Sequence, residues 1–94
     1  MFKIKTTVRI GKKLNAEYPG LWIELACFLK KKKNIRVSPV ARHFIAEVGS
    51  QDEFDNIILD IKQFVKGKTN GDVKIMFRPR DKLLIIGKGK KKWP

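Results

Sequence analysis

Basic side chains are the residues of this chain whose number and spacing could do chemistry, because ammonium and guanidinium groups bind phosphate. They form four groups: Lys30, Lys31, Lys32, Lys33 and Arg36; Arg78, Arg80 and Lys82; Lys88, Lys90, Lys91 and Lys92; and Lys3, Lys5 and Arg9 with Lys12 and Lys13. Lys74 and Arg78 would extend the last group if a neighbouring strand lay beside it. One such run is common on a solvated surface. Four runs in 94 residues favour a polyanionic partner.

The kind of basic residue bears on what is recognised. The chain has 17 Lys and 5 Arg. A lysine ammonium is a point charge on a flexible stem, whereas arginine can fork onto a phosphate or a guanine edge. The ratio therefore predicts recognition of backbone or shape more than of bases. Trp93 adds a ring that could stack on a base, and packing back onto the domain is its competing interpretation.

Catalytic and metal-binding constellations are weak. His43 is the one histidine of the chain, and its position beside Phe44 favours a surface or core-edge role over that of a general base. Cys27 and His43 alone would lack two partners for a metal. Small basic ribonuclease toxins can work without a triad, and Tyr18, His43 and Arg80 would be the candidates here. We expect no catalytic residue, no metal and no cofactor.

Composition sets the class of protein. The net charge of +13 causes self-repulsion and favours a partner that neutralises it. Residues 1–42 carry 11 basic and 2 acidic side chains, and residues 61–94 carry the same numbers. Residues 43–60 between them carry 5 acidic side chains and no Lys or Arg. This distribution predicts one face turned away from the polyanion. A hydrophobic content of 43% excludes a disordered chain, and the length suits one domain.

The N-terminal half predicts strands and helices of mixed clarity. Residues 2–10 alternate apolar and basic side chains, which is typical of a half-buried strand. Residues 21–33 fit a helix or a strand, and their Ala, Leu, Glu and Lys content favours the helix. Residues 35–37 are expected to be extended. Ser38 as a cap and Pro39 in the first turn predict a short helix through Val48.

The C-terminal half is easier to interpret. Ser50 and Glu53 predict a capping box at the start of a helix over residues 51–66, closed by Gly67. Residues 73–77 and 83–86 predict a hairpin with a turn over residues 79–82, and the second strand, apolar on both faces, should lie inside the sheet. The last residues, 88–94, predict a basic tail beyond a single α+β domain over residues 1–87.

Two residues test where the core lies. Cys27 sits among apolar neighbours, which predicts a buried thiol in a reducing compartment. Trp22 is expected in the core or at its edge because of its bulk.

The chain start carries charges where a secretory signal needs an apolar stretch, and the longest hydrophobic segment, residues 21–29, is too short to span a bilayer. These features predict a cytoplasmic protein without a membrane partner.

Together, these patterns predict an α+β fold in which a small antiparallel sheet, made of the N-terminal strand and the C-terminal hairpin, packs against two or three helices. The expected function is non-enzymatic RNA binding, as a ribosomal protein or another ribonucleoprotein component, with other subunits as further partners. RNA is favoured over DNA because the chain lacks helix-turn-helix spacing and a zinc-ligand set. The alternatives are a ribonuclease toxin, a viral or phage assembly protein using Leu21, Trp22 and Phe28 as an interface, and a DNA-binding protein.

Overall fold

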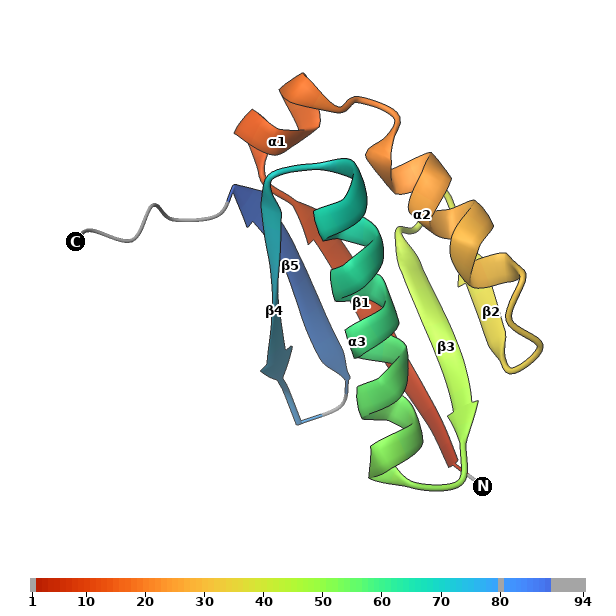
Figure 1. Cartoon of the computed structure of the whole chain (residues 1–94). Coiled ribbons are helices and arrows are strands. Elements are labelled where there is room, and N and C mark those ends of the chain that lie inside the picture. The colour runs from red at the N-terminus through yellow and green to blue at the C-terminus, as the bar shows by residue number, and fades with distance from the viewer. Residues whose placement is uncertain (1, 80, 89–94) are drawn as a thin grey trace.

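The described residues form one sheet and three helices, arranged as Figure 1 shows. The computed structural model describes residues 2–79 and 81–88. The elements follow in the order β1 (Phe2–Ile10), α1 (Lys12–Glu17), α2 (Leu21–Lys30), β2 (Ile35–Ser38), β3 (His43–Val48), α3 (Gln51–Lys68), β4 (Gly71–Phe77) and β5 (Lys82–Lys88). The predicted α+β class is confirmed. Lys88, expected as the first tail residue, is the last residue of β5, and residues 89–94 lie outside the described residues.

The sheet is larger than the sequence predicted and is mixed. Its order is β2-β3-β1-β5-β4. The predicted hairpin is confirmed as β4 and β5, which pair antiparallel, and β5 lies inside the sheet as expected. The expectation of a wholly antiparallel sheet is wrong, because β1 and β5 run parallel. The hairpin turn returns the chain to the side where β1 starts, so the two strands share a direction.

One face of the sheet holds the core. Helices α2 and α3 lie across this face, and α1 sits at one end of the sheet (Figure 1). In β1, Thr6 and Val8 point into the core, while Lys3, Lys5 and Arg9 on the other face are exposed. The core cluster joins this face to the helices through buried apolar side chains that include Leu25, Leu29, Phe44, Phe54, Ile61, Leu84 and Ile86. No described helix covers the opposite face (Figure 1).

The predicted short helix from Pro39 to Val48 is wrong. Residues 43–48 form β3, in which Phe44, Ala46 and Val48 are buried and the residues between them are half-buried. This alternation with a period of two fits a strand, and it outweighs the helix-start signal of Ser38 and Pro39. Residues 39–42 instead join β2 to β3, and the N–H of Val8 donates to the Arg42 carbonyl at 2.8 Å.

The ambiguous segment is the helix α2. Its buried side chains are Leu21, Trp22, Leu25, Ala26 and Leu29. The Trp22 indole Nε1 donates to the Pro39 carbonyl at 2.8 Å, which confirms Trp22 as a core residue. The prediction of a buried Cys27 is wrong, because the helix turns this residue away from the Leu25 and Leu29 stripe and leaves it exposed. Helix α1 was not predicted.

Helix α3 confirms the capping prediction. The Glu53 N–H donates to Ser50 Oγ, and the Gly49 N–H donates to the Glu53 carboxylate at 3.1 Å. The helix passes through Gly67 and ends at Lys68, two residues beyond its predicted end. Thr69 ends it, since its N–H and its hydroxyl both donate to the Val65 carbonyl. None of the described helices is both long and apolar enough to cross a membrane.

Candidate nucleic-acid interface

The uncovered face of the sheet brings basic residues of three strands together. Strand pairing sets rows of neighbours across it: Arg36 of β2 and Lys5 of β1 both pair with Ile45 of β3. In a second row, Arg9 of β1 and Lys74 of β4 both pair with Ile85 of β5. Paired residues point to the same side of a sheet. We call Lys5, Arg9, Arg36 and Lys74 the sheet-face cations.

An aliphatic strip runs between these cations. It consists of Ile45, Met76, Leu83 and Ile85, with Thr7 at its centre. Leu83 is only 8% exposed, although it does not belong to the core cluster beneath the helices. Met76 is 51% exposed. The face is therefore an apolar surface with charged borders, which suits a ligand that has both apolar and anionic parts.

The sheet-face cations carry uncompensated charge. None of them forms an ion pair with another described residue, and Lys5, Arg9, Arg36 and Lys74 are all exposed. Lys3, on the same face, lies 3.9 Å from Glu47. The acidic side chains of residues 52–60 belong to α3, which lies on the other side of the sheet (Figure 1). The four carboxylates of α3 thus lie opposite the basic face, which itself carries two acidic residues, Glu47 and Asp72.

The structure rearranges the groups of cations that the sequence predicted. Lys74 joins Lys5 and Arg9 as anticipated, and Arg36 leaves the α2–β2 group to join them through β2. Lys12 and Lys13 instead lie on α1, beyond the end of β1. Arg80, Lys90, Lys91, Lys92 and Trp93 lie outside the described residues.

Three cations of the other two groups, Lys32, Arg78 and Lys82, have partners within the domain. Lys32 lies 2.8 Å from Asp60 and 5.4 Å from the centre of the Phe28 ring, so it ties α2 to α3. Its neighbours Lys30, Lys31 and Lys33 remain exposed. Arg78 donates to both oxygens of Asp81. Lys82 lies 4.6 Å from the centre of the Phe77 ring.

The aliphatic strip is the part of this face that sequence reasoning missed. Residues 83–86 are apolar on both faces of a strand, and this pattern was interpreted only as burial inside the sheet. With Leu84 and Ile86 in the core, Leu83 and Ile85 must point to the uncovered face. The signal was present in the sequence, but its meaning depends on which face the helices cover.

The two described candidates for nuclease chemistry lie apart. Tyr18 packs against the core on the helix side of the sheet. His43 pairs with Thr7 and belongs to the uncovered face. The sheet therefore separates the two side chains. Within residues 2–79 and 81–88, no three His, Cys, Asp or Glu side chains are grouped so that they could hold a metal ion.

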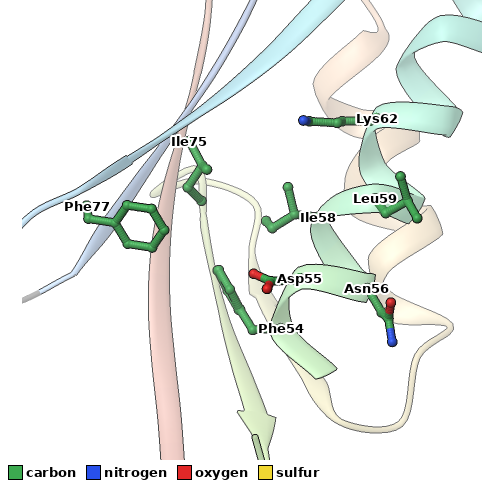
Figure 2. A pocket seen from close by; sticks show the side chains of 8 residues that line it. All are labelled: Phe54, Asp55, Asn56, Ile58, Leu59, Lys62, Ile75 and Phe77. Atoms are coloured by element: carbon green, nitrogen blue, oxygen red, sulfur yellow. The ribbon is translucent and has the colours of Figure 1, made fainter. Parts of the chain in front are cut away.

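A groove of about 340 Å³ lies on the helix side, between α3 and the edge strand β4 (Figure 2). Ile75 and Phe77 project from β4 toward Phe54 and Ile58 of α3. Phe77 is 64% exposed. The groove is lined by one carboxylate, Asp55, and one ammonium, Lys62. Because these charges balance, the groove is not an extension of the cationic interface.

Comparisons with protein-family models, with curated proteins and with solved structures found no match.

Proposed function

We propose that this protein binds RNA without cleaving it and that the uncovered sheet face is its principal interface. One observation carries the proposal: four cations that form no ion pair with a described residue border an aliphatic strip on the face that no described helix covers. The cations neutralise phosphates and release counterions. The strip packs against sugars and bases, which a bare charged surface would not do.

The width of the sheet favours a single strand over a duplex groove. Five strands span about 19 Å, since neighbouring strands lie ~4.8 Å apart. The major groove of DNA is only ~12 Å wide and admits a helix or a two-stranded ribbon. A flat face of this width suits the splayed bases of single-stranded or irregular RNA. The sheet geometry thus adds a physical reason for preferring a single strand over duplex DNA.

The cations lie on several separate parts of the domain surface, which favours a component of a ribonucleoprotein. Lys30, Lys31 and Lys33 are exposed at the end of α2 and in the α2–β2 connection, outside the strands that carry the sheet-face cations. Several separate cationic surfaces allow one small protein to contact several RNA segments. We therefore propose a cytoplasmic ribonucleoprotein component. The assembly alternative loses its basis, because Leu21 and Trp22 are core residues and Phe28 stacks on Phe64.

Binding measurements across a range of salt concentrations test the proposal. The variant Arg9→Gln with Lys74→Gln removes two sheet-face charges, and Lys62→Gln with Lys66→Gln removes two charges from α3 as a matched control. Each lost phosphate contact should reduce the slope of log affinity against log salt by about 0.7 for a single strand. We expect a reduction of about 1.4 for the sheet-face variant and little change for the control.

The same samples decide between a binder and a nuclease. RNA of mixed sequence should remain uncut after prolonged incubation with the protein. If the sheet-face variant and the α3 control variant changed the salt slope equally, the sheet face would not be the RNA interface. Cleaved RNA, abolished by His43→Ala, would establish the toxin alternative instead.

A further inference from the structure

A hollow interrupts the sheet beside the first residues of β1. Residues 2–7 of β1 pair with β3, but pairing with β5 begins only at Thr6. Residues 2–5 therefore have a strand on one side and the β4–β5 turn on the other. The hollow has a volume of about 250 Å³ and is lined by Phe2, Lys3, Ile4, Lys5, Gln51, Arg78, Pro79, Asp81 and Lys82. We call it the notch.

The notch concentrates positive charge from two distant parts of the chain. Lys3 and Lys5 come from β1, and Arg78 and Lys82 come from the hairpin. Asp81 is the one carboxylate in this lining, and both of its oxygens accept from Arg78. With Glu47 beside Lys3, four cations against two carboxylates leave a local charge of +2. Such a surplus attracts an anion, and a concave site holds it better than a flat one does.

The residues that form the notch are held in place. Arg78 is fixed by Asp81, and its N–H also donates to the Asp81 carbonyl at 3.0 Å. Lys82 rests over the Phe77 ring. Because these partners orient the cations before any ligand arrives, less side-chain entropy is lost on binding. Lys5 forms no ion pair with any residue that the structure describes, so its ammonium group can bind the anion directly.

An aromatic ring lies in the same hollow. Phe2 lines the notch and is 46% exposed, although its bulk favours burial. By the alternation of β1, Phe2 belongs to the helix side of the strand, as Thr6 does, and Lys82 pairs with Thr6 on that side. The ring can therefore stack on a base while Lys82, with the other notch cations, binds the attached phosphate. The pairing of ring and cations therefore suits a phosphorylated nucleoside better than an inorganic anion.

We propose that the notch binds the phosphorylated end of an RNA strand, an inference that rests on the proposed RNA-binding function. Lys3 and Lys5 belong both to the notch and to the uncovered face, so the two sites are continuous. A strand lying across the sheet could thus end in the notch. A terminal phosphomonoester carries up to two negative charges, against one for an internal phosphodiester, and matches the surplus of +2 better.

One set of oligonucleotides tests this. A short RNA of fixed sequence is prepared with a 5′-phosphate, with a 3′-phosphate and with neither, and its affinity is measured by fluorescence anisotropy. We expect one phosphorylated form to bind about fivefold to tenfold more tightly than the unphosphorylated RNA. Which of the two it is identifies the end that the notch accepts. Equal affinity of all three forms would overturn the proposal.

Two variants assign the preference to the notch. Lys82→Gln with Phe2→Leu removes a cation and the ring while keeping apolar bulk, and it should bring the affinity ratio of the phosphorylated to the unphosphorylated RNA close to one. Arg9→Gln with Lys74→Gln should weaken both forms and preserve the ratio. A ratio that the notch variant leaves unchanged would also overturn the proposal.

The outcomes separate this inference from the proposed function. Tight binding of RNA without any preference for a phosphorylated end leaves the sheet-face interface standing and removes the notch. If no RNA binds, the proposed function fails, and titration with 5′-uridine monophosphate decides the notch alone. Backbone amide shifts at residues 2–5 and 78–82 would then show its occupation, and their absence would contradict it.

Discussion

Arg78 donates two hydrogen bonds of 2.7 Å to Asp81, from Nε to Oδ1 and from Nη2 to Oδ2. The pair spans the turn between β4 and β5, and both side chains are partly exposed. An exposed ion pair contributes at most about 1 kcal/mol to stability. Arg78→Ala with Arg80→Ala should therefore leave the domain folded while weakening RNA binding, as measured by circular dichroism and anisotropy. Unchanged affinity would remove this turn from the interface.

Substitution of the acidic partner should have the opposite effect on RNA. Asp81→Asn removes one negative charge from the notch, and the amide oxygen can still accept one of the two hydrogen bonds that orient Arg78. We expect affinity for RNA to rise and its salt dependence to steepen, at a cost of about 1 kcal/mol or less in the free energy of unfolding. Weaker binding by this variant would mean that Asp81 matters chiefly for the shape of the turn.

The elements that the sequence predicted well are those with a long, uniform period. Residues 2–10 alternate through nine positions, and the structure has β1 over the same residues. Helix α3 has a complete apolar stripe and a capping residue, Ser50. In both segments the local pattern and the tertiary packing favour the same element, so the local pattern is sufficient to predict its type and bounds to within two residues.

The predictions failed where two local signals conflicted. At residues 38–48, Ser38 and Pro39 resemble a helix start, but the alternation of Phe44, Ala46 and Val48 fits the sheet. Burial of three apolar side chains outweighs one capping preference. Cys27 has apolar neighbours in sequence, yet the helical turn places it outside the buried stripe. Sequence neighbours are a poor guide to burial in a helix.

The interface could be predicted only in part. The basic face of β1 followed from alternation alone. Its extension to Arg36 and Lys74 depends on which strands lie beside β1 and β5 and in which register. Register depends on long-range packing that a single sequence does not reveal. The notch likewise depends on the late start of β5 relative to β1.

Thr6 offers a route to a more stable protein. Its side chain is fully buried, and Oγ1 has no hydrogen-bond partner among the described residues. A buried polar group without a partner costs roughly 1–3 kcal/mol. Thr6→Val should raise the free energy of unfolding by about 1 kcal/mol and the melting temperature by roughly 4–8 °C. Thr7→Val, on the uncovered face, is the control and should change little. A loss of stability at Thr6 would indicate that its hydroxyl has a partner in solution.

Two glycines should respond to alanine in opposite directions. Gly67 lies within α3, and a Cβ added there would meet no atom of the rest of the domain within 4 Å. Gly67→Ala should therefore stabilise the domain by about 0.5–1 kcal/mol. At Gly71 an added Cβ would lie 2.8 Å from Leu14 Cδ2 and 2.9 Å from Thr69 Oγ1. Gly71→Ala should therefore cost roughly 1–3 kcal/mol. Urea denaturation measures both, and a stabilising Gly71→Ala would contradict this packing.

Deletion of residues 89–94 separates the contribution of the tail from that of the domain. Strand β5 pairs with β4 as far as Lys88, opposite Gly71, so a chain ending at Lys88 keeps the whole described sheet. We expect its melting temperature to stay within a few degrees of that of the full chain, because no described core residue is lost.

If Lys90, Lys91 and Lys92 each contact a phosphate, the same deletion should reduce the slope of log affinity against log salt for single-stranded RNA by about 2. A truncated protein that fails to fold would show that the tail is part of the core, and an unchanged slope would show that these lysines remain in solvent when RNA is bound.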